Sequence, residues 1–130
     1  MIGIDTNILL RLYQQDDALQ FAMAQNFIKL NAPVFISTIV LVEFGWVCRS
    51  KFGLSRAEIC KRLQATVDAL EFEFAHKGAV QRAVHEFATR KGDFADYLIA
   101  ETNQANGCAT TMTFDIAASA SNAFTLMESL

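Results

Sequence analysis

Hydrophobic and polar residues follow two kinds of pattern along this chain. Short apolar runs rich in β-branched and aromatic residues are typical of buried strands. They predict strands over Met1–Ile4, Val34–Ser37, Glu71–Ala75, Cys108–Thr113 and Ala123–Met127. Longer segments repeat their apolar side chains with a helical period. They predict helices over Ile8–Tyr13, Ala18–Leu30, Thr38–Arg49, Ser55 to near Leu70, His76–Arg90 and Asp93–Asn106, with a short helical stretch after Asp115.

Strands that alternate with helices in this way predict an α/β fold. The expected architecture is a three-layer α/β/α sandwich with a mostly parallel central sheet. The chain has 130 residues with one Pro and six Gly, and it contains no internal repeat or low-complexity tract. We therefore expect a single domain over residues 1–130.

Capping residues mark several of the expected helix ends. Thr6 or Asn7 is expected to cap the first helix and Asp17 the second. Ser55 with Glu58 three positions later forms a capping box for the helix that follows.

Two helices have apolar sides that we expect to face the core. On the helix Ala18–Leu30 this side comprises Leu19, Ala22, Met23, Phe27 and Ile28, although the same helix also suits a dimer contact. On the helix Thr38–Arg49 it comprises Ile39, Val42, Trp46 and Val47.

Composition bears on the compartment more than on the chemistry. No apolar run approaches the roughly 18 residues that a membrane span needs, and the start of the chain lacks the basic segment of a signal peptide. Cys48, Cys60 and Cys108 are scattered without metal-ligand spacing, which favours reduced core thiols in a cytoplasmic protein. With a net charge of −3, the chain lacks the overall basic character of a nucleic-acid coat protein. This charge does not exclude a nuclease, since metal ions offset clustered acids.

The stretch Lys91–Ala100 has two readings. Gly92 interrupts the preceding helix, Asp93 is a good N-cap, and Asp96 lies on the same face of the new first turn. This pattern is typical of a capped helix with a first-turn acid. It also suits a pair of carboxylates in a functional site.

Other acids occur near the expected strand ends, where open α/β sheets bind ligands. Asp5 ends the first strand, Asp115 follows the strand Cys108–Thr113, and Glu43 lies within an apolar stretch where an unpaired buried carboxylate is costly. Each has a structural alternative: a cap for Asp5, a salt bridge for Glu43 and a turn for Asp115. If they converge with Asp93 and Asp96, they form a carboxylate cluster.

Such a cluster without His or Cys suits the hard cations Mg²⁺ or Mn²⁺. Two such ions can activate water and stabilise the leaving oxygen in phosphodiester cleavage. His76 and His85 are expected on the surface, and the sequence has no glycine-rich phosphate loop.

Four segments, in this order, resemble the PIN-domain family and more narrowly the VapC toxins of bacterial toxin–antitoxin pairs. They are Ile-Gly-Ile-Asp5-Thr6-Asn7, Ile36-Ser37 leading to Glu43, Asp93-Phe-Ala-Asp96-Tyr-Leu-Ile-Ala100, and Thr113-Phe-Asp115. The resemblance implies a metal-dependent endoribonuclease that hydrolyses RNA by metal-activated water and is occluded by a small cognate antitoxin. It also implies a homodimer, and tRNA is the first expected target.

By position, the resemblance assigns an acidic quartet as catalytic and metal-binding residues: Asp5, Glu43, Asp96 and Asp115. Asp93 matches an accessory metal-binding acid, and Asn7 and Thr113 match supporting polar residues. Asp5 and Asp96 are expected to hold the main ion, with Mg²⁺ or Mn²⁺ as cofactor. The chain departs from many relatives after the Thr-Phe-Asp motif, where Ile116-Ala117-Ala118 stands in place of lysines.

Basic residues gather near one helix junction and suit either phosphate contacts or a solvated face. They are Arg49, Lys51, Arg56, Lys61 and Arg62. Other function classes fit less well. A haloacid-dehalogenase-type phosphatase would carry Asp where this chain has Asn7, and a receiver domain would carry a lysine after a late strand. A catalytically silent PIN-fold protein-binding module is the remaining alternative.

Overall fold

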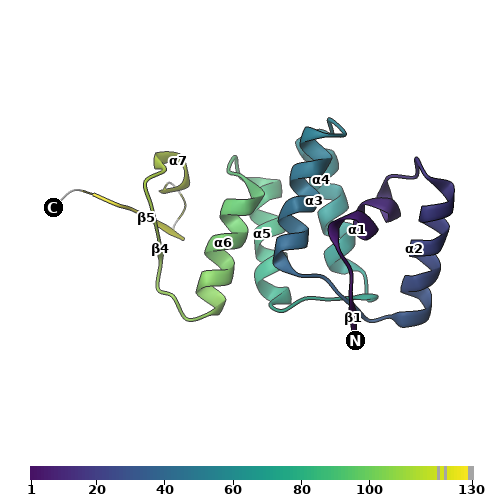
Figure 1. Cartoon of the computed structure of the whole chain (residues 1–130). Helices are drawn as coiled ribbons and strands as arrows, with labels where there is room; N and C mark the ends of the chain where they lie inside the picture. Colours follow the sequence, from purple (N-terminus) through teal and green to yellow (C-terminus); the bar gives the residue numbers. More distant parts are fainter. Residues whose placement is uncertain (120, 122, 129–130) are drawn as a thin grey trace. The chain divides into compact units, whose positions relative to one another are not determined.

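The computed structural model describes residues 1–119, 121 and 123–128. The chain forms two compact units, Met1–Lys77 and Gly78–Leu130. Figure 1 shows their elements in sequence colours, from purple at the N-terminus to yellow near the C-terminus. The prediction of a single domain over residues 1–130 stays a prediction.

The first unit contains a parallel three-stranded sheet in the order β1-β2-β3. Its strands are β1 (Ile2–Gly3), β2 (Val34–Phe35) and β3 (Phe72–Glu73). The ladder continues past β1, because the Ile4 N–H donates to the Phe35 carbonyl at 3.1 Å. Asp5 therefore emerges at the carboxyl end of a hydrogen-bonded strand.

Four helices accompany this sheet in the described part of the first unit. They are α1 (Thr6–Tyr13), α2 (Ala18–Asn31), α3 (Thr38–Ser50) and α4 (Arg56–Asp68). The largest fully buried apolar side chains come from strands and helices alike: Phe44, Leu9, Ile36, Leu41, Leu63, Val34 and Val67. These buried side chains therefore pack α1, α3 and α4 together with the sheet in one core.

Helix α1 begins two residues earlier than the predicted helix Ile8–Tyr13. Thr6 and Asn7 are its first residues, and Asp5 is the N-cap, with Oδ1 accepting from the Ile8 N–H at 3.0 Å. The expectation that Thr6 or Asn7 caps this helix is wrong, because the strand ends close enough for Asp5 to serve the first turn.

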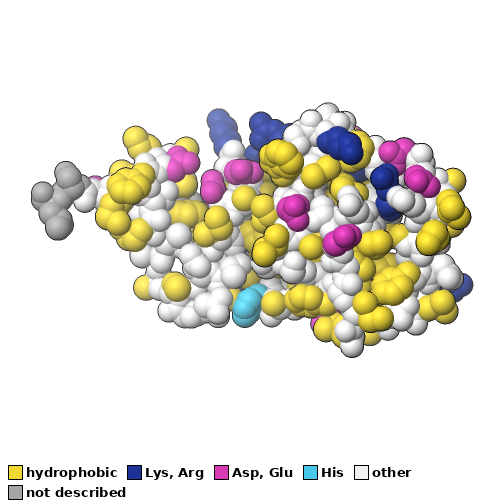
Figure 2. Space-filling model, in the orientation of Figure 1, with side chains coloured by type: hydrophobic (Ala, Val, Ile, Leu, Met, Phe, Trp, Pro, Cys, Tyr) yellow, Lys and Arg dark blue, Asp and Glu magenta, His cyan; other side chains and the backbone are white. Residues whose placement is uncertain are grey.

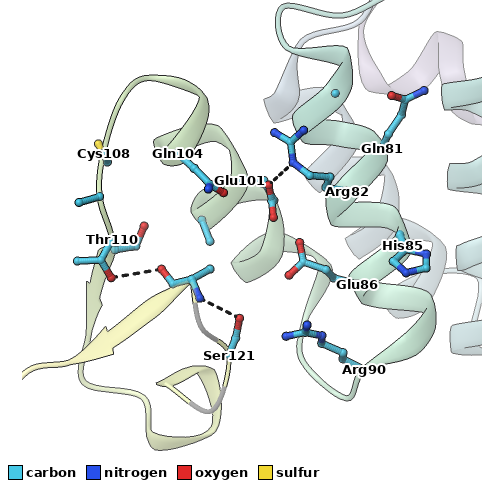
Figure 3. A pocket seen from close by; sticks show the side chains of 15 residues that line it. Gln81, Arg82, His85, Glu86, Arg90, Glu101, Gln104, Cys108, Thr110 and Ser121 are labelled. Atoms are coloured by element: carbon cyan, nitrogen blue, oxygen red, sulfur yellow. Dashed lines mark hydrogen bonds and ion pairs between the residues drawn. The ribbon is translucent and has the colours of Figure 1, made fainter.

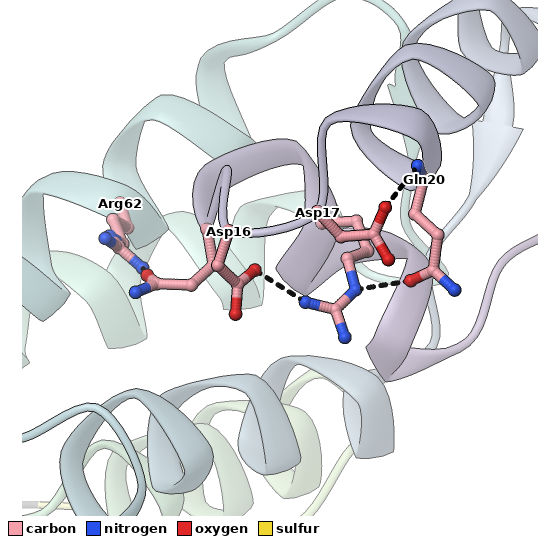
Figure 4. A network of polar contacts seen from close by, with 6 residues as sticks. Asp16, Asp17, Gln20 and Arg62 are labelled. Atoms are coloured by element: carbon pink, nitrogen blue, oxygen red, sulfur yellow. Dashed lines mark hydrogen bonds and ion pairs between the residues drawn. The ribbon is translucent and has the colours of Figure 1, made fainter.

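A polar network joins α1 to α2 (Figure 4). The Arg11 guanidinium forms an ion pair with Asp16 and donates to Gln20 Oε1, both at 2.7 Å. Asp17 caps α2 by accepting from the Gln20 N–H, which confirms the predicted cap. The network fixes the polar turn between the two helices.

The second unit contains a parallel strand pair and three helices in its described residues. The strands are β4 (Thr111–Thr113) and β5 (Phe124–Leu126), and the helices are α5 (Lys77–Thr89), α6 (Phe94–Ala105) and α7 (Ile116–Ser119). Phe87 of α5 packs on Phe94 of α6 with ring centroids 5.8 Å apart. Gly107 has a φ of 90°, which ends α6 as its position predicts.

Strands occur in each of the predicted places, and every described strand pair is parallel. The predicted capping box of α4, Ser55 with Glu58, is also present. These observations confirm the predicted α/β fold class.

The predicted core faces of α2 and α3 are wrong for several of their residues, although Ile28 of α2 is buried as predicted. Leu19 and Met23 of α2 are 71% and 63% exposed, and Ile39 and Trp46 of α3 are 70% and 68% exposed. Helix α3 instead buries Val40, Leu41, Phe44 and Cys48. Since α3 is apolar almost all round, its period does not decide which face meets the sheet.

The cysteines are all free thiols. Cys48 is buried, but Cys108 is exposed, so the expectation of core thiols is wrong for Cys108. None of the helices in the described residues combines the length and hydrophobicity that a membrane crossing requires.

Candidate functional site

The predicted acids fall in both units. Asp5 and Glu43 belong to Met1–Lys77, and Asp93, Asp96 and Asp115 belong to Gly78–Leu130. Each group has its own surroundings.

Asp5 is an exposed residue just beyond β1. Its Oδ1 accepts from the Ile8 N–H at 3.0 Å, so this oxygen stabilises the start of α1. A helix N-terminus favours negative charge. The cap bond therefore fixes the side chain at the strand end through Oδ1 and leaves Oδ2 outside this bond.

Glu43 is exposed midway along α3. Its Oε1 accepts from the Thr6 hydroxyl at 2.9 Å. The apolar sequence around it suggested a buried carboxylate; this is wrong, because α3 turns Glu43 away from its buried face. Thr6, which follows Asp5 directly, thus orients the second acid. Sequence reasoning named Thr6 only as a cap.

The supporting polar residues occupy different positions. Asn7 is exposed on the first turn of α1. Thr113 ends β4, and its Oγ1 accepts from the Asp115 N–H at 2.9 Å. Asp115 in turn caps α7, with Oδ1 accepting from the Ala117 and Ala118 N–H groups at 2.9 and 3.3 Å. Thr113 therefore shapes the turn that presents Asp115.

A pocket of about 510 Å³ in the second unit collects Asp93, Asp96 and Asp115. Asp93 has the backbone geometry of an N-cap, but its side chain makes no capping hydrogen bond. The expectation that this carboxylate caps α6 is wrong. The pocket is also lined by Arg90, Lys91 and Tyr97, among others.

The acids in this pocket affect one another. Burial raises the pKa of Asp96 above its ordinary value, and the charges of Asp93 and Asp115 raise it further. Repulsion of this kind disfavours joint ionisation. A cation placed among these carboxylates would relieve it.

The donor chemistry fits a hard cation, because every predicted ligand offers carboxylate oxygens. Within the described residues of each unit, no three Asp, Glu, His or Cys side chains are grouped closely enough to hold a metal ion. The second unit therefore gathers acids in a pocket without a closed coordination set.

Gly92 approaches the ring of Tyr97 closely at the rim of this pocket. Its N–H donates to Tyr97 Oη at 2.8 Å, and a Cβ at this position would lie 2.5 Å from the same oxygen. Only glycine fits this approach. The sequence indicated Gly92 as a helix break and gave no sign of its contact with Tyr97.

A second pocket of about 560 Å³ in this unit contains a pair of glutamates (Figure 3). Arg82 forms an ion pair with the buried Glu101 at 2.7 Å. Burial raises the pKa of Glu86 to about 7, and a hydrogen bond and charge repulsion from Glu101 contribute, while Arg90 and Arg82 oppose the rise. Glu86 Oε1 is buried without a hydrogen-bond partner among the described residues.

No motif pointed to this pair. A faint sequence signal exists, because Glu101 follows Leu98 by one helical turn on the buried side of α6. His85 lines the same pocket and is exposed, as predicted.

The predicted basic cluster divides into two kinds of residue. Arg62 serves packing, since its Nη1 donates to Gln14 Oε1 at 3.1 Å and its guanidinium lies over the Tyr13 ring. The remaining members are exposed: Arg49, Lys51, Arg56 and Lys61.

Comparison with protein families gives a match over most of the chain. The model of the family described as PIN domain matches residues 2–120, which include every predicted acid. PIN domains are commonly nucleases and typically use divalent metal ions. Among curated proteins, none matches the chain.

Proposed function

The chain belongs to the PIN domain family, and from this premise we propose that it is a metal-dependent endoribonuclease acting as the toxin of a toxin–antitoxin pair. The observation that carries the proposal is the pocket shared by Asp93, Asp96 and Asp115, where burial and mutual repulsion raise the pKa of Asp96. Carboxylates that repel one another gain most from a divalent cation.

The proposed catalytic residues are Asp5, Glu43, Asp96 and Asp115, and the proposed metal ligands are these four with Asp93. When bound, Mg²⁺ or Mn²⁺ supplies the positive charge that activates water and stabilises the leaving oxygen. The chain's own contribution is orientation. The Ile8 N–H holds Asp5, the Thr6 hydroxyl holds Glu43, and Thr113 shapes the turn before Asp115.

The proposed partners are an RNA substrate, with tRNA first, and a cognate antitoxin in the cytoplasm. Clustered carboxylates attract an Arg or Lys of an antitoxin, because charge-assisted hydrogen bonds are strong. A homodimer is supported by the apolar side chains that α2 exposes, since Leu19, Met23 and Leu30 are 71%, 63% and 73% exposed.

The test is incubation of the purified chain with total RNA and Mg²⁺ or Mn²⁺, followed by sequencing of new 5′ ends. We expect cleavage that EDTA abolishes. Asp96→Asn and Asp5→Asn should each lower the rate by about a hundredfold or more, the scale of losing a charge-stabilising group. Asp68→Asn, which changes an exposed acid at the end of α4, is the matched control.

Two outcomes oppose the proposal. If Asp96→Asn and Asp5→Asn both cleave RNA at the wild-type rate, these two acids are not catalytic. A folded chain that cleaves no RNA with either ion would favour the silent protein-binding module instead.

A further inference from the structure

Helix α3 exposes an aromatic side chain beside a proposed metal ligand. Trp46, the chain's one tryptophan, is 68% exposed. Glu43 lies three residues before it, and Ile39, which is 70% exposed, lies four residues before Glu43. This spacing places the three side chains on one face of the helix.

The core does not need this face. Helix α3 buries Val40, Leu41 and Phe44, so Trp46 remains free to bind something else. Large exposed apolar side chains next to polar groups mark binding sites.

The end of α3 carries positive charge. Arg49 and Lys51 are exposed, and Lys51 Nζ lies 5.7 Å from the centroid of the Phe52 ring. The Arg49 guanidinium forms no ion pair with any residue that the structure describes. Figure 2 shows hydrophobic and acidic side chains next to one another over α3, with basic side chains at its upper end.

This composition suits single-stranded nucleic acid better than a partner helix. A protein helix needs a continuous apolar surface, whereas Glu43 interrupts the stripe between Ile39 and Trp46. Single strands combine stacking on an aromatic ring with phosphate contacts to nearby cations. Arg49 and Lys51 supply those cations next to Trp46.

We propose that Trp46 stacks on a base of single-stranded RNA while Arg49 and Lys51 contact its phosphates. The inference rests on the proposed function, because it places the strand next to Glu43. It adds a binding subsite that depends on no metal ion.

Because Trp46 is the chain's one tryptophan, its emission reports the stacking directly. The probe is single-stranded oligouridylate, titrated in EDTA so that no cleavage occurs. We expect saturable quenching that weakens as salt rises. The absence of quenching at low salt would overturn the proposal. It is also the result expected if this face binds a protein partner and not RNA.

Variants separate stacking from folding. With labelled oligouridylate, Trp46→Ala should weaken binding by about 5- to 150-fold, as expected from base–aromatic stacking. Trp46→Phe should retain most of the affinity. Leu70→Ala is the matched control, because Leu70 is 86% exposed and belongs to no proposed contact. Equal affinity of Trp46→Ala and wild type would overturn the proposal.

The two proposals fail differently. Metal-dependent cleavage without quenching would overturn the stacking site alone. If oligouridylate quenches the emission but total RNA is not cleaved in Mg²⁺ or Mn²⁺, the proposed nuclease activity is overturned and the stacking site is supported.

Discussion

Asp5 and Glu43 in the first unit each accept a hydrogen bond from a neutral donor, whereas Asp93, Asp96 and Asp115 in the second unit share one pocket. A donated N–H or O–H stabilises a carboxylate, but neighbouring carboxylates raise one another's free energy. The first arrangement orients its acids without a cation. The second stores repulsion that a cation would remove.

The largest effect should appear when metal is added. Wild-type protein should gain about 2.7 kcal/mol at a Mn²⁺ concentration one hundred times the dissociation constant, which corresponds to a rise in Tm of roughly 5 to 20 °C. Asp96→Asn should melt at the same temperature as apo wild type or higher, because it removes repulsion, and should respond much less to Mn²⁺. Thermal melts with and without the ion measure both quantities.

The contrary result is specific. If Asp96→Asn melts well below apo wild type and still gains fully from Mn²⁺, Asp96 is a structural acid of α6. The acids of the second unit would then not be destabilised by mutual repulsion, and they would no longer differ in this respect from Asp5 and Glu43.

Gly92→Ala should disturb the second group while leaving the first intact. The new Cβ would lie 2.5 Å from Tyr97 Oη, and Tyr97 is only 5% exposed. We expect a loss of about 1 to 3 kcal/mol, the usual cost of overpacking, measured by urea denaturation.

Gly78→Ala is the control for this substitution. Its Cβ would meet only the flexible end of Arg82, at 3.2 Å, so stability should stay level or rise. Equal losses for both variants would show that the Gly92 contact is not the cause.

Glu86→Gln tests whether repulsion between acids costs stability elsewhere in the second unit. The pKa of Glu86 is raised from 4.5 to about 7, so the folded state binds this proton more tightly than the unfolded state. The free energy of unfolding should therefore fall as pH rises from 4.5 to about 7. Glu86→Gln should gain about 1 kcal/mol at pH 8, a value reduced by solvent screening, and little at pH 4.

Melts of wild type and Glu86→Gln across this pH range give the difference. An equal difference at both ends of the range would contradict the raised pKa. Asp68→Asn again serves as a matched control.

Thr6→Val should give the smallest effect. It removes the hydroxyl that donates to Glu43 and should cost about 0.5 to 1 kcal/mol. A double-mutant cycle with Glu43→Ala isolates this bond. A coupling energy near zero would mean that Glu43 is not oriented by Thr6.

The sequence predicted the strands and most helices because their patterns are local. Capping at Asp17 and the box at Ser55 follow from residues within one turn. The orientation of α3 could not be predicted in this way. Its apolar residues encircle the helix, and only the packing of Phe44 and Leu41 against other elements selects the buried face.

The candidate acids could be named from sequence, but their surroundings could not. The bond from Thr6 to Glu43 spans 37 positions, and the approach of Gly92 to Tyr97 depends on a turn that no motif encodes. The pair Glu86 and Glu101 lacks any motif, because its properties arise from burial between helices. Whether the quartet holds a metal ion stays a prediction.

The cap at Asp5 has a consequence for how such a chain could lose activity during evolution. Asn caps helices about as well as Asp, whereas Ala costs about 1 kcal/mol at this position. A relative that drifts toward a non-catalytic role can therefore exchange Asp5 for Asn and keep its α1 start, while losing the negative charge. Inactive descendants should carry Asn or Ser at this position far more often than Ala. These residues keep the cap of α1 after the catalytic carboxylate is lost.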